Sequence, residues 1–122
     1  MKFRSNCPIS CTLDVIGDKW SLIIIRDLLY FKKKTFKDFS NSLENIATNI
    51  LADRLKNLEE KGILTRNDVA ENKKTKHYKL TKKGLALRPI LEELANWSTS
   101  FMKKDHSQML SKKLFLEITK SN

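Results

Sequence analysis

The sequence predicts a mainly α-helical fold with one small β-hairpin. The 122 residues include 40% apolar side chains but only three glycines and two prolines, a composition typical of a compact helical protein. Apolar residues recur at three- and four-residue steps through most of the chain, which is the period of a helix with one apolar stripe. Two short extended runs stand after Gly62. At this length we expect a single domain over residues 1–122.

The charge balance narrows the class of partner. Lysine and arginine number 24 against 14 acidic residues, a formal net charge of +10. Such an excess favours an anionic partner, with nucleic acid ahead of an anionic membrane surface. No apolar run reaches the length of a membrane span, and the basic N-terminus lacks the apolar core of a secretory signal. We therefore expect a cytoplasmic protein without membrane contacts, whose two cysteines are usually reduced.

The first two elements are expected to be helices. Pro8 suits the first position of a helix because its missing N–H needs no partner there, and this places Cys7 at the N-cap. Gly17 ends that helix, and Asp18 then caps a second one. The second helix is so apolar that it must be central to the core.

A third, short helix is expected after a basic turn at residues 32–34. It covers residues 35–43 and has Phe36, Phe39 and Leu43 on its inner side. The basic turn itself either contacts phosphate or, as is commoner for such a run, lies in solvent.

The next helix, expected to begin near Ile46 and to end at Gly62, has two different faces. Its apolar stripe consists of Ile46, Ile50, Leu51, Leu55 and Leu58. The opposite face carries small polar side chains near the helix start and charged ones further on, as a helix in the DNA major groove requires. Together with the preceding short helix it predicts a helix-turn-helix. The residues expected to contact DNA are Thr48, Asn49, Ala52, Asp53, Arg54 and Lys56.

The sequence leaves two possible roles open for some of these side chains. Asn49 suits adenine, whereas the carboxylate of Asp53 either accepts from a cytosine amino group or forms a helix-surface ion pair with Lys56. Arg54 is expected to reach phosphate or to brace the turn rather than to read a base.

Residues 63–69 and 76–80 predict a β-hairpin around a polar tip at residues 70–75. From Thr65 to Gly84 the chain carries seven basic and two acidic residues. A basic hairpin after a helix-turn-helix is typical of the wing of a winged helix, which grips phosphate beside the groove. The alternative is an edge hairpin kept soluble by lysine. The expected phosphate contacts are Lys73, Lys74 and Lys76.

The C-terminal part predicts a dimer. Thr81 caps a long helix that is expected to run to about Lys104 and to bend at Pro89. A final amphipathic helix over residues 106–118 has nothing in its own chain to pack on. Since apolar side chains cover more than one face, we expect residues 98–122 to form a dimerisation tail. The predicted interface residues are Leu91, Leu94, Trp97, Phe101, Leu110, Leu114 and Ile118.

The two cysteines lie one helical turn apart near the N-terminus. A thiol at a helix start, with Lys2 and Arg4 close in sequence, has its thiolate stabilised, so Cys7 is a candidate redox sensor. The alternative is a buried, inert thiol. Cys11 is either the resolving thiol or a core residue, and a bridge between subunits is geometrically preferable to one between these neighbours.

Catalytic and metal-binding functions find no support. His77 and His106 lie in unrelated segments, and the sequence has neither a glycine-rich phosphate loop nor a recognisable nucleophile arrangement. Two cysteines and two scattered histidines do not form a credible zinc site. We therefore expect no enzyme activity, no cofactor and no metal.

The order of motifs resembles one family. The matching segments are Cys7-Pro8, T-L-D-V-I-G-D-K-W at residues 12–20, I-A-T-N-I-L-A-D-R-L-K-N-L-E-E-K-G-I-L at 46–64, Y-K-L-T-K-K-G at 78–84, and Trp97. From Cys7 to Trp97 the chain resembles the HxlR-type winged helix-turn-helix transcriptional regulators, which are related to the MarR group.

The resemblance implies a winged helix-turn-helix core over residues 7–97 with extra N- and C-terminal dimerisation helices. It also implies a homodimeric regulator that binds double-stranded DNA and is commonly a repressor. Several members of the family sense electrophiles or oxidants through the cysteine before the proline, here Cys7, so an oxidant or small-molecule inducer is an expected partner. The family usually has serine where this chain has Ala47, so the helix cap is expected to shift to Thr48 or Asn45. The competing hypothesis is a winged-helix module that binds proteins and does not read DNA.

Overall fold

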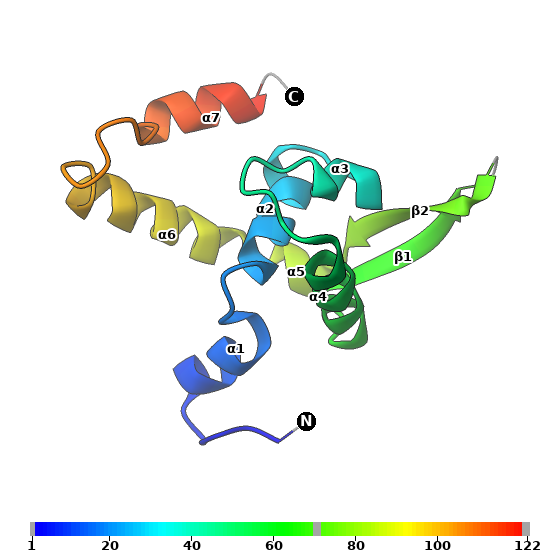
Figure 1. Ribbon diagram of the computed structural model, residues 1–122. Coiled ribbons are helices and arrows are strands. Elements are labelled where there is room, and N and C mark those ends of the chain that lie inside the picture. The colour runs from blue at the N-terminus through cyan, green and yellow to red at the C-terminus, as the bar shows by residue number, and fades with distance from the viewer. Residues whose placement is uncertain (1, 70–71, 121–122) are drawn as a thin grey trace.

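The computed structural model describes the backbone of residues 2–69 and 72–120, and the side chains of these residues except 72–73 and 118–120. The hairpin projects to one side of the helical body, and the last two helices extend on the other side (Figure 1). The expected mainly helical class with one hairpin is confirmed. The elements in chain order are α1 (Pro8–Ile16), α2 (Ser21–Tyr30), α3 (Phe36–Ser40), α4 (Thr48–Glu60), β1 (Leu64–Val69), β2 (Asn72–Leu80), α5 (Lys82–Leu85), α6 (Arg88–Phe101) and α7 (Lys112–Lys120).

The helix starts follow from local chemistry. Cys7 is the N-cap of α1, and Pro8 occupies its first turn. At α2 the Asp18 carboxylate accepts hydrogen bonds from the backbone N–H groups of Trp20 and Ser21, at 3.1 and 3.0 Å. At α3 the cap is Thr35, whose hydroxyl accepts from the third residue of the helix while that residue's side chain bonds back. The start of α1 is as expected. At α2 the N-cap residue is Trp20 rather than Asp18, although the Asp18 side chain accepts from the N–H groups of Trp20 and Ser21.

An apolar core joins α2, α3, α4 and the hairpin. Ile25, Phe39, Leu51 and Leu58 have no exposed surface, and the stripe predicted on α4 faces this core. The side chains of the buried cluster are Ile16, Ile24, Ile25, Phe39, Ile46, Leu51, Leu55, Leu58, Ile63, Leu64 and Leu80. The opposite face of α4 is therefore turned to solvent.

The junction between α4 and β1 directs the hairpin. Gly62 has a φ of 73°, the left-handed conformation that ends a helix at low cost for glycine. The N–H groups of Gly62 and Ile63 donate to the carbonyls of Glu59 and Leu58, which closes the helix end. The strands then pair antiparallel from Leu64 opposite Leu80 outward. As a result the wing leaves the core beside the end of α4.

The helix expected from Thr81 to Lys104 is interrupted rather than bent. Helix α5 ends at Leu85, and α6 begins at Arg88 with Pro89 in its first turn. Proline has no N–H to donate to a carbonyl four residues back, and this loss has no consequence in the first turn of a new helix. The chain therefore makes two helices where one was predicted.

Leu43 does not lie on the inner side of α3. It is 89% exposed, whereas Phe39 is fully buried. The helix ends at Ser40, so the helical period that would turn residue 43 inward no longer applies. Ser42 takes the buried place instead. The expected inner position of Leu43 is wrong.

The last helix begins later than expected and has a partner within its own chain. Helix α7 starts at Lys112, and the ring of Phe115 lies edge-on to Tyr30 and Phe31 with centroids 5.5 and 6.3 Å apart. The expectation that the tail has nothing in its own chain to pack on is therefore wrong. Edge-to-face contacts of this kind stabilise a docked helix by roughly 0.5–1.5 kcal/mol each.

Candidate nucleic-acid interface

Helix α4 presents a continuous polar face. Its apolar side is buried on the core, so the side chains three and four residues apart on the other side stand together in solvent. The expected outward face is confirmed as exposed at Thr48, Asn49, Ala52, Asp53 and Lys56. Short side chains stand at its first turn, where a close approach to base edges needs little bulk.

The start of α4 has no side-chain cap. Ala47 is the N-cap residue, with extended backbone (φ −63°, ψ 140°) and no side-chain cap hydrogen bond. The predicted shift of the cap to Thr48 or Asn45 did not occur: Thr48 is already the first residue of the helix, and Asn45 has a left-handed backbone with φ 56°. A helix start with unsatisfied N–H groups favours an anion such as a phosphate oxygen.

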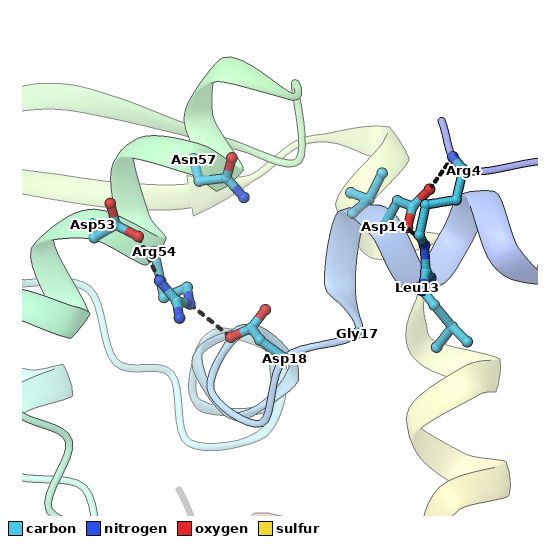
Figure 2. A pocket seen from close by; sticks show the side chains of 9 residues that line it. Arg4, Leu13, Asp14, Gly17, Asp18, Asp53, Arg54 and Asn57 are labelled. Atoms are coloured by element: carbon cyan, nitrogen blue, oxygen red, sulfur yellow. Dashed lines mark hydrogen bonds and ion pairs between the residues drawn. The ribbon is translucent and has the colours of Figure 1, made fainter. Parts of the chain in front are cut away.

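Arg54 braces α4 against the start of α2. Its Nε donates to the Asp18 carboxylate at 2.8 Å, and its Nη1 pairs with Asp53 (Figure 2). Asp53 therefore pairs with Arg54, whereas the alternative considered from the sequence was an ion pair with Lys56. Burial raises the pKa of Asp18, but hydrogen bonds from Ser21 and Arg54 outweigh it and hold that pKa below its ordinary value.

A buried charge network holds the helix-turn-helix together. Asp27 on α2 is 1% exposed and accepts from Arg26 at 2.8 and 3.1 Å, from the Lys33 ammonium at 3.3 Å and from the Ser42 hydroxyl. Arg26 also grips Glu44 with two hydrogen bonds, at 2.7 and 2.9 Å. The network thus ties α2 to the α2–α3 turn and to the α3–α4 turn.

Sequence reasoning missed this network. The available signal was the pair Arg26-Asp27 inside the otherwise apolar run L-I-I-I-R-D-L-L-Y. Charged residues in a core helix are almost always paired. The partners Lys33, Ser42 and Glu44 lie on two different turns, so their identity could not be read from spacing.

The basic turn 32–34 has structural roles. The Lys33 ammonium belongs to the buried network, and the Lys34 carbonyl accepts from the N–H of Tyr78 on β2 at 2.7 Å. Lys32 is exposed and has a φ of 52°. The sequence predicted that this turn contacts phosphate or lies in solvent. Lys33 does neither, since its ammonium pairs with Asp27 inside the fold.

The hairpin carries the expected lysines. Lys74 is exposed, and Lys76 is ion-paired with Asp68 across the strands. The side chain of Lys73 lies outside the described residues. Tyr78, two positions after Lys76, places its ring edge-on to Phe39 at 5.8 Å, which anchors the base of the wing to the core.

A hollow of about 590 Å³ opens between α3 and β2. Lys37 on α3 lines it together with the two wing lysines, Lys74 and Lys76, of which Lys76 is paired with Asp68. Lys37 was not among the sequence-predicted contacts, although its place one residue into α3 beside a basic turn was a usable signal. The hollow is lined by Thr35, Phe36, Lys37, Ser40, Lys74, Thr75, Lys76 and Tyr78.

The N-terminal thiols differ in their surroundings. Cys7 is exposed, and its backbone N–H donates to the Ser5 hydroxyl at 3.2 Å. The Cys11 thiol is half-buried and donates to the Ser5 carbonyl at 3.4 Å. Arg4, expected to favour a Cys7 thiolate, instead pairs with Asp14 on α1 at 2.5 Å. Both thiols are free, and the exposed one is accessible to an oxidant.

Apolar side chains remain in solvent on α1, α6 and α7. On α6, Leu94 is 49%, Trp97 59% and Phe101 71% exposed, while Leu91 is half-buried against the core. Leu110 and Leu114 are exposed near the C-terminus, and the side chain of Ile118 lies outside the described residues. Ile9 on α1 is 72% exposed. Exposed apolar surface of this extent marks an interaction face.

Two further properties of the described residues bear on function. Among residues 2–69 and 72–120, no group of three or more histidine, cysteine or acidic side chains is arranged to hold a metal ion. In the same part of the chain, no helix combines the length and hydropathy needed to cross a bilayer.

Comparison with known proteins assigns the family. The model of the HxlR-like helix-turn-helix family matches residues 15–106. The chain belongs to the HxlR-like helix-turn-helix family. The uncharacterised HTH-type transcriptional regulator YvaP of Bacillus subtilis (strain 168) is 33% identical over 103 residues, covering 84% of this chain and 94% of YvaP. This HxlR-family chain is accordingly a transcriptional regulator with a DNA-binding helix-turn-helix fold, as the motif resemblance implied.

Solved structures agree with this assignment. The crystal structure of PA1607 superposes with a TM-score of 0.72 at 39% identity, covering 81% of this chain and 68% of that one. The redox regulator HypR in its oxidised form superposes with a TM-score of 0.67 at 32% identity, covering 77% of this chain and 96% of HypR. The HxlR-type fold described above, with its hairpin beside the helix-turn-helix, is thus shared along most of the chain.

Proposed function

We propose that this HxlR-family chain is a homodimeric, sequence-specific DNA-binding repressor of the cytoplasm that thiol oxidation at Cys7 releases from its operator. The observation that carries the DNA-binding part is the polar face of α4. It is exposed, it is braced on the start of α2 by the Arg54–Asp18 ion pair, and it is followed in the chain by a basic hairpin. A rigid polar helix beside cationic side chains is the arrangement that enters a major groove and holds the neighbouring phosphates.

Reading and positioning fall to different residues in this proposal. Thr48, Asn49 and Asp53 stand where base edges would lie, and Asn49 suits the two hydrogen-bonding groups of adenine. Ala52 and Lys56 complete the exposed face, and Arg54 acts through Asp53.

The phosphate contacts come from the wing and from α3. Lys74 and Lys76 stand opposite Lys37 across the hollow between α3 and β2, and Lys73 joins them by its place in the sequence. Point charges at this position attract every phosphate alike, so they strengthen binding without selecting a sequence.

The dimer follows from the unpartnered apolar surface. Leu94, Trp97 and Phe101 recur at three- and four-residue steps and stand exposed on α6, which is the pattern of a helix that packs on another. Leu91, Leu110, Leu114 and Ile118 extend the proposed interface into residues 98–122. A two-fold dimer would set two α4 helices one DNA turn apart, about 34 Å, on a pseudo-palindromic site.

The thiol switch rests on the exposure of Cys7 and on a similar protein. Cys7 stands at the start of α1, a helix with exposed apolar side chains of its own, and HypR, similar along most of this chain, is a redox regulator. Bulk or a crosslink added at Cys7 would displace α1, and Cys11 one turn on is the second thiol. An inter-subunit bridge is preferable to a Cys7–Cys11 bridge within one helix.

A binding comparison tests the proposal. Genomic and random DNA are titrated with the full-length chain at two salt concentrations, reduced and diamide-treated. We expect tight, oxidant-sensitive binding to a subset of genomic fragments. Asn49→Ala should lower discrimination between site and random DNA by roughly 1–3 kcal/mol. Lys74→Ala should weaken binding to all sequences and flatten the salt slope by about one.

Controls separate the parts of the proposal. Cys7→Ser should bind as the wild type does and ignore diamide, whereas Cys11→Ser should keep a response. Leu94→Glu with Trp97→Glu should give monomers in sedimentation velocity, while Leu85→Glu, exposed on α5, should stay dimeric. Equal affinity for every fragment would contradict sequence reading and favour a protein-binding module instead.

A further inference from the structure

Asp18 is a rigid anchor beside the DNA-reading helix. Its Oδ2 accepts from the N–H groups of Trp20 and Ser21 at 3.1 and 3.0 Å, and its Oδ1 accepts from the Ser21 hydroxyl at 2.5 Å. Three donors from one turn leave the carboxylate a single orientation. It lies on a polar hollow of about 640 Å³ between α1 and α4, which Asp53 and Arg54 also line (Figure 2).

Arg54 joins this anchor to the outward face of α4. Its Nε bonds to Asp18 at 2.8 Å, and its Nη1 pairs with Asp53. Because the guanidinium is planar, fixing Nε on one carboxylate fixes where Nη1 points. The Asp53 side chain is 67% exposed, and an exposed carboxylate held by nothing would sample several rotamers. The bridge holds it in one.

The bridge also has an electrostatic consequence. A carboxylate in the major groove is repelled by the flanking phosphates unless a cation offsets its charge. Arg54 supplies that cation beside Asp53 without occupying the outward face, since the Arg54 side chain is only 28% exposed. Asp53 therefore keeps the ability to accept from a cytosine amino group.

We infer that Asp18 is a positioning residue for sequence reading: through Arg54 it sets the orientation in which Asp53 meets a cytosine-containing base pair. The inference rests on the proposed function, because it assumes that α4 reads DNA. It goes beyond that function in assigning base selectivity to a residue at the α1–α2 junction that touches no DNA.

The test is selection of binding sites from a randomised duplex library by the full-length chain. Asp18→Asn keeps an oxygen that accepts the α2 cap bonds but removes the charge that holds Arg54. Asp14→Asn is the matched control, since Asp14 lines the same hollow and pairs with Arg4 instead. Thermal unfolding by circular dichroism verifies that each variant is folded.

The expected result is a loss confined to one base pair per half-site. Asp18→Asn should lower the preference for cytosine there at least about fivefold, the lower bound for one good base contact. Asp53→Asn should lose the same preference, and the double variant should lose no more than about twofold beyond either one. Asp14→Asn should select the wild-type consensus, and its affinity for random DNA should match that of Asp18→Asn.

Three outcomes would overturn the inference. Asp18→Asn selecting the wild-type consensus, weakening all sequences equally, or adding its loss to that of Asp53→Asn would each show that the bridge has no part in reading. Should Asp18→Asn not fold, Arg54→Lys gives the same test, because a single ammonium keeps the charge but cannot bridge two carboxylates. A wild-type chain that selects no consensus would instead refute the proposed function, and the inference with it.

Discussion

Removing the Asp27 carboxylate should destabilise the whole helix-turn-helix. Asp27 is 1% exposed and receives hydrogen bonds from Arg26, Lys33 and Ser42. Deleting one partner of a buried charge cluster costs about 3–5 kcal/mol, because the remaining charges lose their compensation. Arg26 keeps Glu44, and the Lys33 side chain is 22% exposed and can reach water. We therefore expect Asp27→Ala to cost about 3 kcal/mol, the lower end of that range.

Chemical and thermal unfolding check this value. At this chain length 1 kcal/mol shifts Tm by about 4 °C, so Asp27→Ala should lower Tm by roughly 12 °C. The matched control is Asp68→Ala, which breaks an exposed ion pair with Lys76 on the hairpin and should cost less than about 1 kcal/mol. If Asp27→Ala cost no more than Asp68→Ala in urea unfolding, the network would not hold the fold together and the reasoning would fail.

Three other perturbations have expected outcomes. Gly84→Ala should destabilise by more than Gly62→Ala in urea unfolding: a Cβ at Gly84 would lie 2.3 Å from a backbone carbonyl oxygen, whereas Gly62 has open space and only a φ of 73°, worth about 1–2 kcal/mol. Hydrogen bonds from Arg26 lower the pKa of Glu44, so the stability this pair adds is present above about pH 4.3 and is lost as pH falls through the lower pKa of the folded state. The Tm of Glu44→Gln should accordingly fall less steeply than that of the wild type as the pH is lowered through this range. An equal decrease of Tm in both proteins would contradict this expectation. Phe115→Ala should speed proteolytic cleavage before α7, since this ring docks the helix on the end of α2; an unaltered cleavage rate would show that the docking adds nothing.

The sequence alone determined the features that depend on neighbours in the chain. The stripe that includes Leu51, Leu55 and Leu58 specifies both the existence of α4 and its buried side, because a helical period sorts residues onto faces whatever they pack against. The start at Cys7-Pro8 and the stop at Gly62 act over a few residues and were equally readable. The family motifs combined these local signals in a fixed order.

Local signals also explain where the expectations were wrong. In the sequence, Leu43 continues the helical period of Phe36 and Phe39, but helix α3 ends at Ser40. Pro89 was expected to bend a helix, but it lies in the first turn of a new one. The missing N–H of proline is compatible with either position, so it could not distinguish them. In both cases the pattern gave the residue's preference and the rest of the fold decided which outcome was realised.

Only the tertiary structure decided which charges meet. Asp18 and Arg54 are 36 residues apart, and Asp27 and Ser42 are 15 apart, so no spacing rule joins them. The sequence alternative paired Asp53 with Lys56 by helical distance, but Arg54 lies against Asp18 and its fork reaches Asp53 as well. A long charged side chain can reach several partners, and packing of the backbone selects among them. The outward face of α4 could therefore be named from the sequence, whereas Asp18, the partner that holds Arg54 in place, became apparent only in the fold.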